Sequence, residues 1–182
     1  MIVTPTAIPE VMLVEPVVHG DRRGFHLETW HEPRYAAAGI PGPFVQDNHS
    51  RSAAHTLRGL HYQIRQPQGK LVWAAVGAIF DVAVDLRRSS PTFGRWVSAM
   101  LTDENHHQLW VPPGFAHGFY VLSRQADVMY KCTAPYAAEL DRALRWDDPA
   151  LGIAWPLAAA GSPLLSPKDA AAPALRDAEA YP

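Results

Sequence analysis

Two neighbouring stretches of the sequence carry side chains whose types suit acid–base chemistry. LRGLHYQ (57–63) contains Arg58 and His61, and GKLVWAAVGAIFDVAVDLR (69–87) follows with Lys70 near its start. A neutral imidazole is an effective general base near neutral pH because its unperturbed pKa is about 6.5. A cation beside the base stabilises developing negative charge, and an arginine fork suits phosphate. The pattern therefore indicates proton abstraction from a phosphorylated substrate.

Short β-strands are expected to position these side chains. The 182 residues include 17 prolines and 12 glycines, which divide the chain into short apolar runs typical of an all-β sandwich or barrel. DVAVDLR (81–87) alternates apolar and polar residues, as a half-buried strand does. KLVWAAVGAIF (70–80) is more continuously apolar, as in a strand covered on both sides. EPRYAAAG (32–39) is the clearest helical candidate and ends at Gly39.

The length and composition indicate one domain over residues 1–182. A hydrophobic content of 48% is enough to fill one core. The alanine-rich tail contains Pro167, Pro173 and Pro182, so we expect an irregular C-terminal wrap from about residue 157.

The charge balance excludes several classes of partner. Sixteen basic and eighteen acidic residues give a formal charge of −2, so no basic field recruits nucleic acid or an anionic membrane. The N-terminus lacks the pattern of a signal peptide and no apolar run reaches membrane-spanning length, which predicts a cytoplasmic protein. Cys132 is the only cysteine, which excludes an internal disulfide, and it is expected to be a small buried side chain.

A metal site is a competing interpretation of the nine histidines. WVPPGFAHG (110–118) resembles the second motif of cupins through Pro112, Gly114 and His117. The first cupin motif needs a His-x-His pair, whereas this chain has His61-Tyr62-Gln63. Isolated histidines would hold a first-row metal poorly. We therefore expect no metal and no cofactor, and a metal-dependent cupin enzyme stays as the less favoured alternative.

Several long motifs, taken in order along the chain, resemble the dTDP-4-dehydrorhamnose 3,5-epimerase family. The resemblance implies a mainly all-β, cupin-type β-barrel or jelly roll with a few short helices, usually a homodimer that shares strands. VMLVEPVV (11–18) would suit an exchanged strand, because an unpaired apolar edge would aggregate. The motifs that carry the resemblance are GDRRGFHLETW (20–30), LRGLHYQ (57–63), SSPTFGRW (89–96), QLWVPPGFAHGFYVL (108–122), MYKCTAPY (129–136), RWDDPALGIAWP (145–156) and LSPKD (165–169).

The resemblance also implies a reaction. It is epimerisation at C3 and C5 of dTDP-4-keto-6-deoxy-D-glucose to dTDP-4-keto-L-rhamnose, which makes the chain an isomerase. His61 matches the family's base and Asp169 the carboxylate that fixes its tautomer. Lys70 would stabilise the C4 enolate, and Tyr130 matches the proton donor. From the residues alone, Lys70 would more often be a solvated edge-strand lysine, and Tyr130 is more typical of a core residue with its hydroxyl satisfied.

Further matches concern binding of the dTDP-4-keto-6-deoxyhexose. Singly, these residues would also fit surface charges, turn residues or, for His117, a structural histidine. Phe25 and Tyr136 are candidates for stacking on the base. The matched binding positions are Arg23, Glu28, Gln46, Asp47, Asn48, Arg58, Lys70, His117, Asp141 and Lys168.

Three departures from the family pattern concern recognition more than chemistry. His26 stands where a second aromatic is common, and Trp73 where arginine is often found. Glu139 lies two residues from Asp141, the better match to the family's acidic position. A single-centre epimerase of another dTDP-4-keto-deoxysugar, and a non-catalytic sugar-nucleotide binding module, remain competing interpretations.

Overall fold

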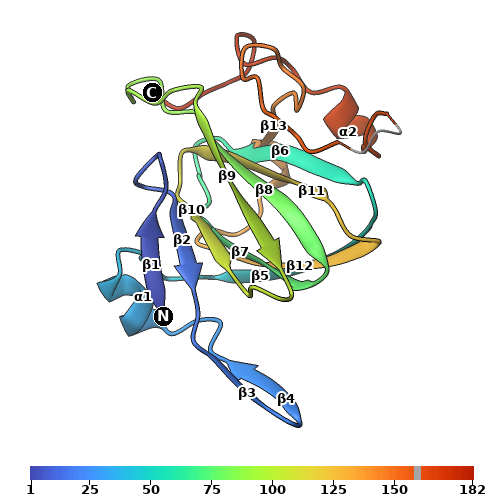
Figure 1. Ribbon diagram of the computed structural model, residues 1–182. Helices are drawn as coiled ribbons and strands as arrows, with labels where there is room; N and C mark the ends of the chain where they lie inside the picture. The colour runs from blue at the N-terminus through green and yellow to red at the C-terminus, as the bar shows by residue number, and fades with distance from the viewer. Residues whose placement is uncertain (158–160) are drawn as a thin grey trace.

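The computed structural model describes residues 1–157 and 161–182, and across these residues two antiparallel sheets face each other (Figure 1). The six-stranded sheet has the order β1 (Ile2–Pro5), β2 (Met12–Glu15), β10 (Gln108–Val111), β7 (Lys70–Val76), β12 (Gln125–Cys132) and β5 (Gln46–Ala53). The five-stranded sheet has the order β13 (Asp141–Ala143), β6 (Leu57–Gln63), β11 (Phe115–Val121), β8 (Ala78–Asp85) and β9 (Trp96–Thr102). The expected mainly all-β class is confirmed.

The other elements lie outside the two sheets. A hairpin of β3 (Val18–Asp21) and β4 (Gly24–Leu27) projects away from the barrel (Figure 1). The expected helix is confirmed as α1 (Glu32–Ala37), and Gly39 follows it with a φ of +88° that favours glycine. The remaining short helices are a 3₁₀ turn at Ala138–Leu140 and α2 (Pro167–Ala170).

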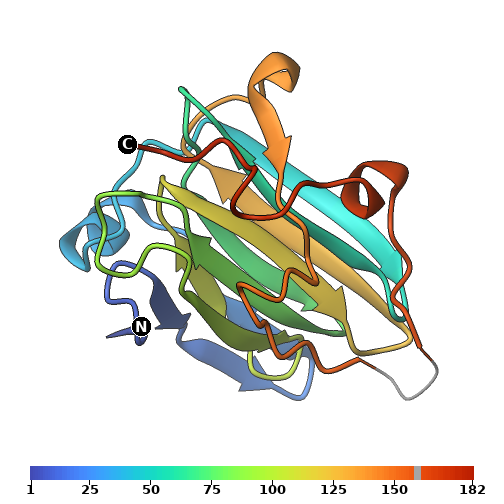
Figure 2. The same cartoon turned by 90° about the horizontal axis from the view of Figure 1, so that it is seen from above.

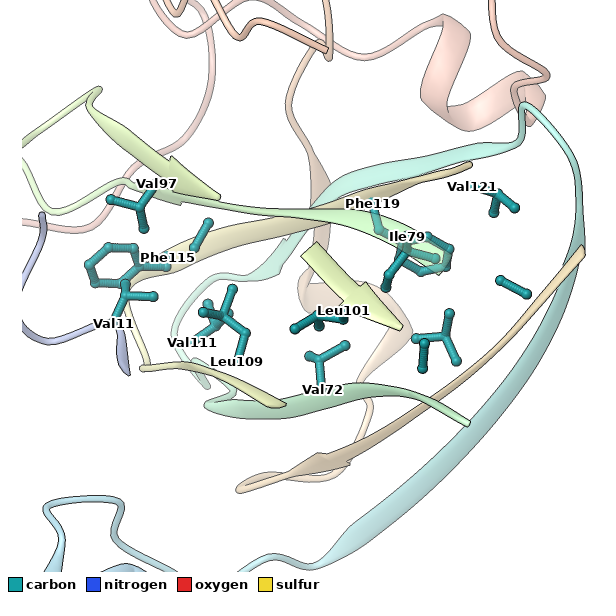
Figure 3. Close-up of a cluster of buried hydrophobic side chains, with 14 of the residues drawn as sticks. Val11, Val72, Ile79, Val97, Leu101, Leu109, Val111, Phe115, Phe119 and Val121 are labelled. Carbon is teal, nitrogen blue, oxygen red and sulfur yellow. The ribbon is translucent and has the colours of Figure 1, made fainter. Parts of the chain in front are cut away.

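The main hydrophobic core lies between the sheets (Figure 3). Val72 and Leu109 reach it from the six-stranded sheet, and Ile79, Phe115 and Phe119 from the five-stranded sheet. Alternate residues of a strand point to one face, so each strand supplies an inward apolar row. Complete burial of a side chain such as Leu109 contributes about 1.5–3 kcal/mol. This core fixes the separation of the two sheets.

The predicted half-buried strand at 81–87 is buried on both faces instead. Asp81 and Asp85 are completely buried in β8, which lies between β11 and β9. A second cluster, to which Leu144 and Leu151 belong, packs on the outer face of this sheet. Figure 2 shows the C-terminal segment, in orange and red, crossing that face. The alternation was real, but the tail covers the apolar row of Val82, Val84 and Leu86. The row that the pattern indicated as exposed, with Asp81 and Ala83, is turned to the core between the sheets.

The predicted continuous strand at 70–80 is interrupted. Gly77 separates β7 from β8 with a φ of +78°, and a Cβ there would lie 2.2 Å from the Gln125 carbonyl oxygen. Ala75 and Val76 before it are exposed. A bend at this glycine therefore places the two halves of the apolar run in different sheets.

Isolated β-bridges help to tie the C-terminal tail to the barrel. Leu164 forms a bridge with Thr56, and Tyr181 forms one with Arg87. The start of the expected irregular wrap at about 157 adjoins residues 158–160, which lie outside the described residues. The division of the chain into one domain stays a prediction.

The candidate exchanged strand at 11–18 is paired within its own chain. Met12–Glu15 pairs with β1 on one side and β10 on the other, so both of its edges are occupied within the chain. Exchange of a strand between subunits stays a prediction. The projecting part of the N-terminal region is the β3–β4 hairpin that follows it. In the described residues, no helix has the length and apolar character needed to cross a membrane.

Candidate active site

A pocket of about 420 Å³ opens between the two sheets. The six-stranded sheet contributes β5, β7 and β12 to its wall, and the five-stranded sheet contributes β6, β11 and β13. The lining side chains are Gln46, Asn48, Ser50, Arg58, His61, Tyr62, Gln63, Gln68, Lys70, His117, Phe119, Tyr130, Cys132, Tyr136, Asp141 and Lys168.

His61, which is partly exposed to the pocket, pairs with the buried Asp169. The Nε2 atom of His61 lies 2.5 Å from Oδ1 of Asp169, whose side chain is 2% exposed. Burial by itself would raise the pKa of Asp169, but hydrogen bonds from His61, Ser166 and the Gly59 backbone outweigh it and lower that pKa. The ionised carboxylate accepts the Nε2 proton and leaves Nδ1 of His61 as the basic nitrogen.

The one-turn helix α2 places this carboxylate. Ser166 is its N-cap and accepts a hydrogen bond from the Asp169 backbone N–H at 3.1 Å, while Pro167 occupies the first turn with a suitable φ. The short sequence Ser-Pro-Lys-Asp thereby directs Lys168 toward the pocket and Asp169 toward His61.

A second histidine–aspartate pair lies beside the first. His117 Nε2 donates to Asp81 Oδ1 at 2.8 Å, and both residues are buried. The other carboxyl oxygen of Asp81 is buried with no hydrogen-bond partner among the described residues. His117 is therefore held by a carboxylate from β8, with its Nδ1 left free for a ligand.

Two glycines bring these histidines together. His61 on β6 and His117 on β11 are paired in the antiparallel register. Beside them, a Cβ on Gly59 would lie 2.6 Å from the Gly118 Cα, and one on Gly118 would lie 2.7 Å from the Arg58 carbonyl oxygen. Only glycine permits this approach of the two backbones, which sets the spacing of the histidine pair.

Lys70 and Tyr130 line the opposite wall from His61. Desolvation lowers the pKa of Lys70, while electrostatic interactions with Cys132, Asp141 and Asp81 act in the opposite direction. Within the described residues, no group accepts a hydrogen bond from the Lys70 ammonium. Burial raises the pKa of Tyr130, so its phenol stays protonated near neutral pH.

The rim of the pocket brings together several predicted binding residues. Asp141 accepts hydrogen bonds from the Lys168 ammonium and, at 3.1 Å, from the Tyr136 hydroxyl. Gln46 donates to Asn48 at 3.0 Å on the inward face of β5. Asp141 lines the pocket and Glu139 does not, which agrees with the preferred match.

Three predicted binding residues lie outside this pocket. Asp47 lies between Gln46 and Asn48 on β5, whose side chains line the pocket, so its own side chain points to the other face of the sheet. There it forms an ion pair with Lys131 at 2.7 Å. Glu28 pairs with Arg34 at 2.9 Å. Arg23 is on the projecting hairpin, paired with Asp21, and its side chain is 85% exposed.

The sequence interpretation missed several residues at the site. Asp81 was attributed to the outer face of its strand, and no local signal pairs it with a histidine 36 residues away. Gln63 and Gln68 also line the pocket, and their residue type alone does not mark them as part of a site. Cys132 is buried, as expected, and its side chain also lines the pocket.

The described residues contain no group of three or more His, Cys, Asp or Glu side chains arranged to hold a metal ion. Gln63 stands where the His-x-His pair of cupins has its second histidine. Its side chain is hydrogen-bonded to three backbone groups: it donates to the carbonyls of Gln66 and Pro135 and accepts from the Ala137 N–H. A carboxamide that is fully occupied in this way does not fit a metal ligand.

Comparison with known proteins agrees with this geometry. The family model described as dTDP-4-dehydrorhamnose 3,5-epimerase matches residues 5–177. The dTDP-4-dehydrorhamnose 3,5-epimerase of Pseudomonas aeruginosa is 57% identical over 180 residues, with 98% of each chain covered. That of Salmonella typhimurium is 51% identical over 180 residues, covering 98% of this chain and 97% of the relative.

A solved structure extends the likeness to the whole fold. The dTDP-6-deoxy-D-glucose-3,5-epimerase of Legionella pneumophila, in complex with dTDP-4-keto-L-rhamnose, has a TM-score of 0.94 and 51% identity. The match covers 97% of this chain and 94% of that one, and it confirms the cupin-type barrel. This chain belongs to the dTDP-4-dehydrorhamnose 3,5-epimerase family.

Proposed function

We propose that this protein epimerises C3 and C5 of dTDP-4-keto-6-deoxy-D-glucose and so forms dTDP-4-keto-L-rhamnose. The observation that carries the proposal is the position of His61 and Tyr130 on opposing sheets of one pocket. Inversion at carbon requires that a proton leave one face and return to the other. A sugar held between the two sheets meets a base on one side and a phenol on the other.

His61 is the base in this mechanism. Its Nδ1 takes the proton from the carbon next to the C4 ketone, and the Asp169 carboxylate stabilises the imidazolium that forms. Tyr130, kept protonated by burial, returns a proton to the opposite face of the carbanion. The same pair serves both centres when the intermediate presents C3 and then C5 to His61.

Lys70 stabilises the enolate in this mechanism. Its ammonium lies in the pocket wall beside Tyr130 on the neighbouring strand, with no competing acceptor among the described residues. A charge that is already desolvated interacts strongly with an oxyanion because little water must be displaced. His117 holds a sugar hydroxyl through Nδ1, with its ring fixed by Asp81.

The diphosphate of the substrate binds to positively charged side chains at the mouth of the pocket. Arg58 lines it, with its Nε hydrogen-bonded to Ser52 at 2.9 Å and its Nη2 to the Arg51 carbonyl oxygen at 3.4 Å, an arrangement that holds the guanidinium at the pocket. Lys168 supplies a second positive charge at the rim. Tyr136, 56% exposed, offers a ring face to the base.

The active form proposed here is a homodimer in which the hairpin of one subunit reaches the pocket of its partner. This is supported by the isolation of Arg23 from the pocket of its own chain and by exposed apolar residues on and beside the hairpin. Val17 is 52%, Val18 40% and Phe25 62% exposed. A symmetric pair would bury these side chains and complete both sites. The cytoplasmic location expected from the sequence stays a prediction.

The proposal is tested by incubating the protein with dTDP-4-keto-6-deoxy-D-glucose in D₂O, without added metal, and following both carbons by NMR. Deuterium at C3 and at C5, with formation of the L-rhamno product, is the expected result. His61→Ala should abolish both exchanges because the base is lost. Exchange at one carbon alone would make the protein a single-centre epimerase, and no exchange would reject the acid–base mechanism.

A further inference from the structure

A short loop at the rim of the pocket is held by glutamine side chains along its whole length. The loop is 134–137, which follows β12 and contains Tyr136. Gln68 Nε2 donates to the Ala134 carbonyl at 2.8 Å, and Gln63 Nε2 donates to the Pro135 carbonyl at 3.2 Å. The first two residues of the loop are therefore held through their carbonyl oxygens.

The next two residues are held through their N–H groups. Gln46 Oε1 accepts from the Tyr136 N–H at 2.7 Å, and Gln63 Oε1 accepts from the Ala137 N–H at 2.7 Å. Each of the four consecutive residues of the loop thus has one backbone group hydrogen-bonded to a glutamine side chain. We call the three glutamines, Gln46, Gln63 and Gln68, the glutamine clamp. Its members come from β5, from the end of β6 and from the segment before β7. The clamp therefore joins the loop to both sheets.

Gln63 has the features of a structural anchor. Its side chain is 2% exposed, and its amide also donates to the Gln66 carbonyl at 3.0 Å. Both N–H donors and the carbonyl oxygen are therefore satisfied. A buried polar network in which every group is paired is rigid, and loss of one partner leaves the others unsatisfied.

The clamp leaves the Tyr136 ring open to a ligand. The phenol donates to Asp141 at 3.1 Å, so the side chain is fixed at its tip as well as at its backbone. The residue is nevertheless 56% exposed at the rim of the pocket. A fixed aromatic face stacks on a planar base at low entropic cost.

We propose that Gln63 and Gln68 are positioning residues that hold Tyr136 for stacking against the nucleobase of the substrate. The inference rests on the proposed function, because it takes the ligand to be a dTDP-sugar. The two glutamines act through the loop. Their removal should therefore weaken nucleotide binding and leave the proton transfers at His61 unchanged once the site is saturated.

A double-mutant cycle with dTDP as the probe tests this inference. Isothermal titration calorimetry would compare wild type, Gln68→Leu, Tyr136→Ala and the double variant. We expect Gln68→Leu to raise the dTDP Kd by about tenfold when Tyr136 is present, and by less than about twofold in the Tyr136→Ala background. The maximal rate of C–H exchange should stay within about twofold of wild type.

Gln63→Leu should raise the dTDP Kd more than Gln68→Leu does in the same cycle. If Gln63→Leu does not fold, Gln68→Leu alone tests the inference. Gln66→Leu is the matched control, because its side chain is exposed and makes no hydrogen bond within the described residues. Equal effects of Gln68→Leu with and without Tyr136 would overturn the inference in favour of direct ligand contact. A wild-type protein that does not bind dTDP would overturn the proposed function as well.

Discussion

His61 and His117 are direct cross-strand neighbours on β6 and β11. Each donates a hydrogen bond from Nε2–H to a buried aspartate, and the two aspartates come from different elements. Asp169 comes from α2 and Asp81 from β8. The two rings therefore present Nδ1 as the nitrogen available to a ligand. Their environments differ, because Asp169 is held by several donors whereas one oxygen of Asp81 has no partner among the described residues.

Asp169→Asn should lower kcat severely while the fold is retained. The amide cannot stabilise an imidazolium as a carboxylate does, and it no longer selects the tautomer with a basic Nδ1. A loss of about 10³-fold or more is expected for deuterium exchange at both carbons. Asp147→Asn, which alters an exposed acid paired with Arg145, is the control and should retain full activity. Near-normal exchange in Asp169→Asn would reject the pair as the source of the base.

Asp81→Asn should weaken substrate binding without lowering the stability of the fold. Replacement of a fully buried carboxylate by a neutral amide removes a desolvation cost, so thermal unfolding should occur at an equal or higher temperature. His117 would at the same time lose its charged partner. We expect KM for the sugar nucleotide to rise by about tenfold, equivalent to about 1.4 kcal/mol of binding free energy. A lower melting temperature with unchanged KM would indicate a purely structural pair.

Lys70→Met should stabilise the protein near neutral pH and suppress catalysis. Desolvation lowers the Lys70 pKa in the folded state, so the unfolded chain binds the proton more tightly. Below the folded pKa the buried charge costs stability, and stability rises as pH increases from that value toward 10.5. Removal of the ammonium should therefore raise the melting temperature at pH 7 and reduce kcat by about 10²–10³-fold.

The same pKa shift predicts a pH profile. Enolate stabilisation requires the charged ammonium, so wild-type kcat/KM should fall as pH rises through the lowered pKa of Lys70. Cys132, Asp141, Asp81 and Lys168 are the charged or titratable groups that act on it. The residual activity of Lys70→Met should lack this alkaline limb. Persistence of an identical limb would assign it to another group.

Mixed dimers should reveal whether the hairpin acts on its partner. His61→Ala and Arg23→Ala subunits would be co-expressed with different tags and compared with each variant alone. If Arg23 completes the partner's pocket, each heterodimer contains one intact site, and random assembly restores about a quarter of wild-type activity. If the hairpin serves its own chain, no intact site forms and the mixture stays as inactive as its components.

Gly118→Ala should disturb the spacing of the two histidines. The new Cβ would lie 2.7 Å from the Arg58 carbonyl oxygen, a backbone atom that cannot rotate away. Displacement of β6 from β11 should cost about 1–3 kcal/mol in the free energy of unfolding, measured by urea denaturation. Gly20→Ala, whose Cβ meets nothing nearer than 3.9 Å, is the control. An unchanged stability for Gly118→Ala would contradict the close approach.

The sequence by itself determined the local features of this protein. The distribution of proline and glycine predicted short strands, and Gly39 predicted the end of α1. Long motifs pointed to the family and, through it, to His61, Lys70 and Tyr130. The inferences about strands, the helix end and the family succeed because strand period, turn chemistry and motif spacing are properties of residues that are near one another in the chain. The roles of the three site residues stay a proposal.

The tertiary structure decided which distant residues meet. His61 and Asp169 are 108 residues apart, and apart from the family resemblance of the LSPKD motif nothing in the sequence pairs them. Alternation separates the two faces of a strand but does not say which face is turned to the core, so Asp81 reads as an exposed residue although its row is turned inward, where it pairs with His117. The glutamine clamp joins four loop residues to segments more than 60 positions away. Such contacts depend on how the two sheets pack, which is a property of the whole chain.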